Sequence, residues 1–133
     1  YKNLSSRRIP IRRGVKQGDP LSSLLFNIVM DELFDICGAD FGYTVANNHS
    51  TNLRCFADDI VLVSGSQIGM NSLLKSTVDF LKRRGLQTNP KKCMSIGIMK
   101  GYKGKKSKIL TDPVFSIGKE KIPVLGMPPN CTK

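Results

Sequence analysis

The sequence has few of the residues that build zinc sites or disulfide frameworks. It contains one histidine, His49, and four cysteines that lie far apart without a Cys-x-x-Cys pair. Neither kind of site is therefore indicated. No apolar run approaches the ~20 residues that a membrane-spanning helix needs, and "YKNLSSRRIP" at the start lacks the apolar segment of a signal peptide. We expect an intracellular protein with no membrane contact.

The length of the chain limits how many domains it can form. It has 133 residues, of which 40% are hydrophobic, which is enough to bury one ordinary core. The sequence begins without methionine and ends at "PPNCTK" without an obvious stop. We therefore expect one domain, or a piece of one, taken from a longer polypeptide.

Charge is distributed unevenly along the chain, whose net charge is +11. Residues 1–16 carry six Lys/Arg and no acid, residues 17–80 carry two basic and eight acidic groups, and residues 81–133 carry thirteen basic and two acidic groups. Basic flanks suit a polyanion such as nucleic acid, whereas an acidic centre suits a divalent cation. A charge run is often only a solvated face, but this segregation favours a polyanion.

The first half of the sequence predicts a helix followed by a β-hairpin. In "QGDPLSSLLFNIVMDELFDIC", Asp19 can cap a helix and Pro20 suits its first position. Apolar residues at helical spacing predict the buried face, namely Leu21, Leu25, Ile28, Leu33 and Ile36. The β-prone runs "NLRCFA" and "IVLVSG" are separated only by Asp58 and Asp59, so we expect a hairpin with this acidic pair at or beside its turn.

The second half predicts another helix, a strand and a second hairpin. The helix should run from about Ser66 to Arg84 and stop at Gly85, and its predicted buried face is Met70, Leu73, Leu74, Thr77, Val78 and Leu81. "CMSIGIM" alternates like a strand, "KGYKGKKSK" at 100–108 is expected to be an exposed loop, and "PVFSIGKEKIPVL" predicts a hairpin turning at Gly118 and Lys119. This order predicts an α+β domain with helices packed on one face of an antiparallel sheet.

The adjacent aspartates in "FADD" need an explanation. Two like charges ~4 Å apart repel by roughly 4 kcal/mol at an effective dielectric of ~20. A positive group, such as a divalent cation, would offset this repulsion. The alternative is that the pair only solvates a hairpin turn, because aspartate is common in turns.

Three segments resemble, in order, three successive motifs of the reverse transcriptase palm. They are "GVKQGDPLSSLLFNIVMDEL" at 14–33, "FADD" at 56–59 and "GLQTNPKKC" at 85–93. An ordered set over roughly 80 residues is far more specific than a lone Asp-Asp pair. The sequence is most similar to non-LTR retrotransposons, especially the site-specific elements that insert into ribosomal RNA genes. The resemblance implies that residues 1–108 are part of a palm in a right-hand polymerase fold. Residues 109–133 would lead toward the thumb and toward a primer grip beyond Lys133.

The resemblance also implies a reaction. Polymerases of this kind use two magnesium ions, with manganese as a substitute, to align a primer 3′ hydroxyl with the α-phosphate of a deoxynucleoside triphosphate. Asp58 matches the first and stronger metal ligand, and Asp59 matches the second. Lys92 occupies the place of a lysine that can protonate the departing pyrophosphate. A lysine after Asn-Pro is as often simply exposed, so the two interpretations of Lys92 are balanced.

Further implied contacts concern the nucleotide and the nucleic acid. Gln17 and Gly18 would lie against the incoming nucleotide and the templating base pair, with Phe26 and Asn27 following on the helix. The alternative is that Gly18-Asp19-Pro20 serves only as a helix entry. The partners would be an RNA template, a DNA primer or target and deoxynucleoside triphosphates, in the nucleus; the sequence leaves the oligomeric state open. Basic residues expected to contact the nucleic-acid backbone are Arg12, Arg13, Lys16, Lys100, Lys103, Lys105, Lys106 and Lys108.

One departure from the family pattern leaves two hypotheses open. The principal metal-binding aspartate of the family lies on a strand upstream of the first helix, and residues 1–13 contain no aspartate. The chain could therefore be part of a working RNA-directed DNA polymerase, or a catalytically inactive remnant that only binds nucleic acid. The intact acidic pair favours the first hypothesis. Group II intron and telomerase-like polymerases remain as rivals within the wider family.

Overall fold

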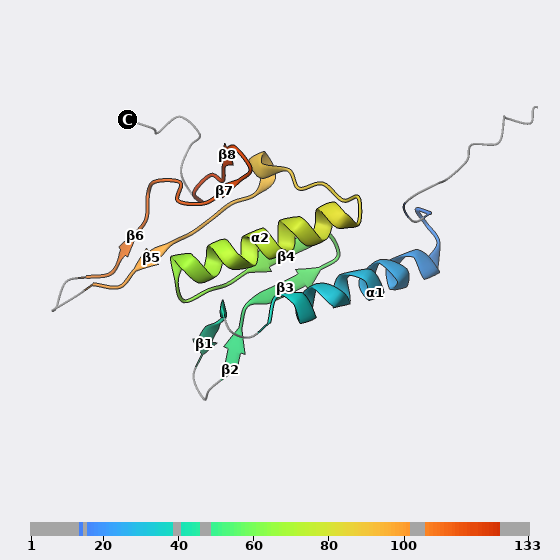
Figure 1. Cartoon of the computed structure of the whole chain (residues 1–133), viewed down its shortest axis with the longest axis horizontal. Helices are drawn as coiled ribbons and strands as arrows, with labels where there is room; N and C mark the ends of the chain where they lie inside the picture. The colour runs from blue at the N-terminus through green and yellow to red at the C-terminus, as the bar shows by residue number, and fades with distance from the viewer. Residues whose placement is uncertain (1–13, 15, 39–40, 46–48, 102–105, 126–133) are drawn as a thin grey trace, which may run out of the picture.

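The chain folds as an α+β domain of two long helices and several short antiparallel hairpins (Figure 1). This computed structural model describes residues 14, 16–38, 41–45, 49–101 and 106–125. In chain order the elements are α1 (Pro20–Ile36), β1 (Tyr43–Val45), β2 (His49–Thr51), β3 (Leu53–Phe56), β4 (Asp59–Leu62), α2 (Gln67–Arg83), the 3-10 helix η3 (Pro90–Lys92), β5 (Ile98–Met99), β6 (Lys108–Ile109), β7 (Ser116–Ile117) and β8 (Glu120–Lys121). The predicted fold class is confirmed.

The strands pair only within hairpins in the part of the chain that the structure describes. Four separate antiparallel pairs form, β1 with β2, β3 with β4, β5 with β6, and β7 with β8. One isolated parallel bridge joins Ser95 to Val124. The antiparallel β-structure expected from the sequence is therefore present as separate two-stranded sheets among the described residues. These strands are two to four residues long.

Helix α1 begins where the sequence predicts. Asp19 has an extended backbone, and its side chain accepts a hydrogen bond from the Leu21 N–H at 3.0 Å. Pro20 occupies the first helical position, where its missing N–H leaves no hydrogen bond unmade. Before the cap, Gly18 has φ +86°, which glycine adopts without the steric cost that other residues incur. Local chemistry alone therefore starts this helix.

The buried face of α1 differs from the predicted one. Met30 and Leu33 are buried, as is Cys37 at the C-cap, and Phe26 packs against them. Of the predicted face, only Leu33 is buried. The other four residues are exposed, namely Leu21, Leu25, Ile28 and Ile36. The helix carries apolar residues on more than one side, so helical spacing permits two faces. Contact with β3 and α2 selects the face that contains Leu33.

The predicted hairpin forms as β3–β4, with a two-residue turn made by Ala57 and Asp58 and with Asp59 directly after the turn. Side chains of adjacent residues in a strand point to opposite faces of the sheet. The pairs Leu53–Leu62 and Cys55–Ile60 face the core, while Arg54–Val61 and Phe56–Asp59 lie on the other face. Ala57 has φ +52°, in the left-handed region that tight hairpin turns require.

Helix α2 confirms its predicted limits. Ser66 caps it by accepting a hydrogen bond from the Gly69 N–H at 3.0 Å, and Gly85, at φ +73°, follows its C-cap. Within the predicted face, Leu73, Thr77 and Leu81 are buried, whereas Met70, Leu74 and Val78 are half-buried. Phe80, which lies outside the predicted face, is fully buried. Helix α2 contacts α1 and β4 as well as β7, so its apolar surface is broader than one stripe.

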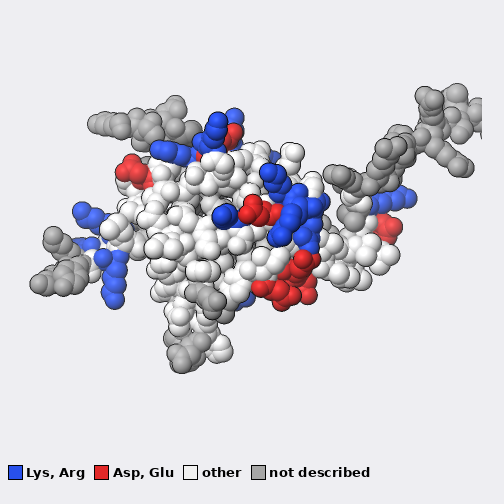
Figure 2. Space-filling model, in the orientation of Figure 1, with Lys and Arg blue, Asp and Glu red and all other residues white. Residues whose placement is uncertain are grey.

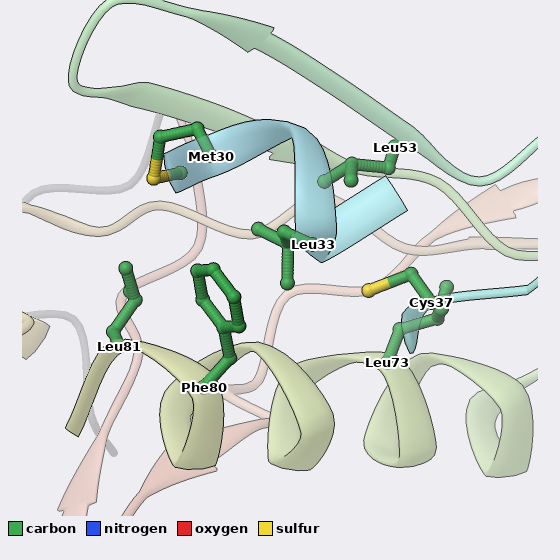
Figure 3. Packing of buried hydrophobic residues seen from close by; sticks show 7 residues of the cluster. All are labelled: Met30, Leu33, Cys37, Leu53, Leu73, Phe80 and Leu81. Carbon is green, nitrogen blue, oxygen red and sulfur yellow. The ribbon is translucent and has the colours of Figure 1, made fainter. Parts of the chain in front are cut away.

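The core joins the hairpin to both helices. Figure 3 shows side chains of α1, β3 and α2 meeting at its centre, among them Leu33, Leu53 and Phe80, which are fully buried. Each such side chain stabilises the fold by roughly 1.5–3 kcal/mol relative to leaving it in water. The Cys37 thiol lies 3.7 Å from the Thr77 hydroxyl, and burial raises the pKa of this thiol. Because Leu53, Cys55, Ile60 and Leu62 of the β3–β4 hairpin pack in or against this core, the core holds the part of the hairpin from which the tip extends.

The C-terminal part only partly matches the predicted strands. The hairpin turning at Gly118 and Lys119 is confirmed, with Gly118 at φ +61°. Within "CMSIGIM", β-structure is limited to the Ser95 bridge and β5, because only these residues find a pairing partner. The predicted exposed loop at 100–108 ends in strand β6, and Lys103 and Lys105 lie outside the described residues. The β1–β2 hairpin was not predicted.

Candidate active site

A cleft of about 480 Å³ lies at the tip of the β3–β4 hairpin. It brings residues of all three motifs together: Phe26 from α1, Asp58 and Asp59 from the hairpin, and Lys92 from η3. The remaining lining residues are Met30, Ile60, Leu81, Leu86, Gln87, Thr88, Asn89, Cys93 and Met94. Met30 and Leu81 also belong to the core cluster, so the floor of the cleft is the edge of the hydrophobic core. A rigid apolar floor with polar groups at the rim is typical of a ligand site.

The two aspartates occupy different backbone positions. Asp58 is the second residue of the turn, whereas Asp59 is the first residue of β4 and pairs with Phe56. Both residues are exposed. Among the described residues, the single ion pair joins Arg84 to Glu32, so neither aspartate is neutralised by a cationic side chain in direct contact. Water lowers their mutual repulsion but leaves both carboxylates available to a cation.

The donor set suits a hard divalent cation. Carboxylate oxygens are the ligands that Mg²⁺ and Mn²⁺ prefer. Asp58 and Asp59 would supply two such groups, although the described residues contain no cluster of three or more His, Cys, Asp or Glu that could hold a metal. The chemistry of the pair therefore fits a metal site of which it forms one side.

Lys92 reaches the cleft on a short, well-defined turn. Pro90 opens η3, and Asn89 caps it by accepting a hydrogen bond from the Lys91 N–H at 3.1 Å. Lys92 is exposed and lines the cleft together with both aspartates. The neighbouring Cys93 is half-buried, and desolvation raises the pKa of its thiol, which keeps it protonated and poorly nucleophilic at neutral pH.

The predicted nucleotide-contacting residues are not all brought together. Phe26 lines the cleft, but Gln17, Gly18 and Asn27 do not. Gln17 and Gly18 form an exposed turn before α1, and Asn27 is an exposed residue of that helix. Sequence reasoning overlooked three polar lining residues, Gln87, Thr88 and Asn89. Their position inside "GLQTNPKKC", the motif that supplies Lys92, was the signal that could have found them.

The described part of the basic flanks is accessible. Lys16, Lys100, Lys106 and Lys108 are exposed, whereas Arg12, Arg13, Lys103 and Lys105 lie outside the described residues. Figure 2 shows that Lys and Arg on the viewed face occur in separate groups, one of them directly beside a group of acidic side chains. One basic–acidic contact is the Arg84–Glu32 pair, in which the Arg84 guanidinium also lies 3.9 Å from the centroid of the Phe80 ring.

The hairpin tip thus carries two adjacent carboxylates and lies on an α+β core beside the turn that bears Lys92. The family described as "Reverse transcriptase (RNA-dependent DNA polymerase)" matches residues 1–128. The chain therefore belongs to the reverse transcriptase family.

Its curated relatives are retrotransposon polyproteins. The chain is 44% identical over 121 residues to the "Retrovirus-related Pol polyprotein from type-2 retrotransposable element R2DM" of Drosophila melanogaster, covering 91% of this chain and 11% of the relative. It is 37% identical over 114 residues to the type-1 retrotransposable element R2 polyprotein of Nasonia vitripennis, and this match covers 86% of this chain and 11% of the relative. A polyprotein of the same description from Popillia japonica is 40% identical over 97 residues, and this match covers 70% of this chain and 13% of the relative.

These matches confirm the predicted resemblance to non-LTR retrotransposon reverse transcriptases. The chain spans about a tenth of the length of the relatives that it matches. Within the described residues, no helix is both long and apolar enough to cross a membrane.

Proposed function

We propose that this chain is the central palm portion of an RNA-directed DNA polymerase that extends a primer with deoxynucleotides on an RNA template. The observation that carries the proposal is the shared cleft, because residues far apart in the sequence, Asp58, Asp59 and Lys92, line one 480 Å³ space. Membership of the reverse transcriptase family supports the same reaction. In this proposal residues 1–108 form the palm portion, and residues 109–133 lead toward the primer grip and thumb.

The aspartates act as metal ligands in the proposed reaction. Asp58 and Asp59 would hold magnesium, as two ions or with manganese as a substitute, which when bound would align the primer 3′ hydroxyl with the α-phosphate and neutralise phosphate charge. Because Mg²⁺ requires near-octahedral coordination, a further carboxylate from another part of the longer polypeptide would complete the set. The exposure of both side chains in the cleft supports this assignment.

The other residues of the proposed site bind and orient the substrate or move a proton. Lys92 would donate a proton to the departing pyrophosphate from its ammonium group. Phe26 would give the nucleotide an apolar surface within the cleft. Gln17, Gly18 and Asn27 do not line the cleft. In this proposal they would contact the nucleotide and the templating base pair where these extend beyond it.

Phosphate contacts would hold the nucleic acid without reading its sequence. The basic residues in this role are Arg12, Arg13, Lys16, Lys100, Lys103, Lys105, Lys106 and Lys108. The partners would be an RNA template and a DNA primer or target, in the nucleus. The inactive, binding-only alternative is not favoured, because it gives no reason for a repulsive acidic pair to share a cleft with Lys92.

The proposal is tested in the complete polypeptide that contains this chain. Asp58→Ala should abolish Mg²⁺-dependent primer extension on an RNA template, because a metal ligand is lost, while RNA affinity stays nearly unchanged. Asp112→Ala is the matched control, since Asp112 is exposed and does not line the cleft. Extension at the parental rate by Asp58→Ala would refute the metal assignment.

A further inference from the structure

The turn that carries Lys92 is held by Asn89. The Asn89 backbone is extended, with φ −107° and ψ 100°, as favoured before a proline. Its side-chain Oδ1 accepts a hydrogen bond from the Lys91 N–H at 3.1 Å, and its carbonyl oxygen accepts one from the Lys92 N–H at 3.0 Å. The Cys93 thiol donates to the same carbonyl at 3.3 Å. One residue therefore contacts each of the three that end the turn.

The segment from Leu86 to Ser95, which contains this turn, is anchored at both ends. At the α2 end, the Leu86 N–H donates to the Leu81 carbonyl at 2.9 Å. At the far end, the Ser95 N–H donates to the Pro123 carbonyl at 2.8 Å, and the Ser95 carbonyl accepts from the Leu125 N–H at 2.8 Å. Residues 87–94 cross the side of the cleft between these anchors. Asn89 accepts most of the hydrogen bonds that shape the turn there, and the Cys93 N–H adds one to the Pro90 carbonyl at 3.2 Å.

The orientation of the turn decides where the Lys92 ammonium can reach. Lysine has four rotatable side-chain bonds, and an exposed lysine samples many rotamers. The backbone direction at Lys92 therefore sets the region that its ammonium occupies. Pro90 limits φ at the first position of the turn, and the Asn89 cap satisfies the Lys91 N–H. Without the cap the turn would sample other orientations and present Lys92 to the cleft for less of the time.

We propose that Asn89 is a positioning residue for Lys92: its cap on η3 holds the lysine toward the cleft that contains Asp58 and Asp59. This inference rests on the proposed function, because it assigns Asn89 a role only through Lys92. The rival explanation is a direct contact between the Asn89 amide and the nucleotide, since Asn89 also lines the cleft. In the structure Oδ1 is already used by the cap.

A double-mutant cycle in the complete polypeptide separates these explanations. Single-turnover incorporation rate and nucleotide Kd are measured for the parental protein, Asn89→Ala, Lys92→Ala and the double variant. Asn89→Ser is the rescue variant, because serine also caps well. Asn71→Ala is the matched control: Asn71 is an exposed residue of α2 that does not line this cleft.

Positioning predicts a specific pattern. Asn89→Ala should slow incorporation roughly five- to tenfold, as expected for a lost cap, with the nucleotide Kd unchanged. Asn89→Ser should restore the rate, and Asn71→Ala should match the parental protein. In the Lys92→Ala background, Asn89→Ala should cause no further loss.

Two results would overturn the inference. If Asn89→Ala slows incorporation by the same factor with and without Lys92, then Asn89 acts independently of the lysine. If Asn89→Ser is as slow as Asn89→Ala, the amide itself is needed and the cap is not. A parental rate for Lys92→Ala alone would instead remove the lysine from the proposed mechanism. A failure of the proposed function is therefore distinguishable from a failure of the inference about Asn89.

Discussion

Phe56 pairs with Asp59 across the β3–β4 hairpin, which leaves Asp58 in the two-residue turn. Asp59 therefore has the backbone of a paired strand residue, and its side chain points to the face opposite the core-facing Ile60. Asp58 has no such cross-strand partner. Asp58 and Asp59 are adjacent in sequence, but they occupy different backbone positions while lining the same cleft.

This difference predicts unequal effects of the same substitution. Asp58→Asn should reduce primer extension more than Asp59→Asn, because Asp58 is proposed as the stronger metal ligand and asparagine keeps the shape but not the charge. The measurement is the initial rate of extension in the complete polypeptide at several Mg²⁺ concentrations. The opposite order, with Asp59→Asn the more severe, would reverse the assignment of the two ligands.

Lys92→Ala should slow the chemical step more than it weakens nucleotide binding, because a general acid acts mainly in the transition state. The typical contribution of such a group is ~10²–10⁴-fold. Single-turnover incorporation measures the chemical step, and its nucleotide dependence gives the Kd. Lys91→Ala is the matched control, as the preceding lysine is exposed but does not line the cleft. Equal rates for the two variants would make Lys92 an ordinary surface lysine.

Neutralising the five lysines from Lys100 to Lys108 should weaken nucleic-acid binding without changing sequence preference. Each lost phosphate contact should reduce the slope of log affinity against log salt by ~0.7–0.9. The substitutions are to glutamine at Lys100, Lys103, Lys105, Lys106 and Lys108 together. Fluorescence anisotropy with two unrelated RNA sequences at several salt concentrations gives both quantities. A control that neutralises five exposed basic residues elsewhere, Lys75, Lys82, Arg83, Lys119 and Lys121, reports the effect of the same change in net charge. An equal slope in both variants would exclude a local contact of the 100–108 lysines.

Residues 1–133 expressed alone should show no polymerase activity, because Asp58 and Asp59 supply too few ligands to hold two metal ions in reacting geometry. The assay compares the isolated chain with the complete polypeptide on the same RNA template and primer. Extension by the isolated chain would show that the catalytic groups have been misplaced.

The isolated chain should also self-associate through α1. The side chains of Leu21 and Ile28 are 56% and 61% exposed, and several neighbouring apolar residues of the helix are exposed as well. Such a patch favours association in water. Replacing Leu21 and Ile28 with glutamate should lower the mass measured by light scattering while leaving helix content unchanged. Replacing Met30 with glutamate should unfold the chain, since that residue is buried. An unchanged mass for the surface variant would place the association elsewhere.

The sequence by itself determined the local features of this protein. The cap at Asp19, the limits of α2 near Ser66 and Gly85, and the β3–β4 turn beside the acidic pair were predictable, because each depends on contacts within a few residues. The motifs around Asp58 and Lys92 were recognisable for a similar reason. Each of them is short, and their order along the chain is visible without a structure.

Only the tertiary structure decided how these parts combine. The apolar residues of α1 permit more than one buried face, and packing against β3 and α2 chose the face that contains Met30 and Leu33. The same packing buried Phe80. It also placed Lys92 beside the acidic tip, because the direction of the chain after α2 depends on long-range contacts such as Ser95 with Pro123. Local hydrogen bonding fixes where an element begins and ends, whereas the free energy of burying apolar surface between elements fixes which side chains meet.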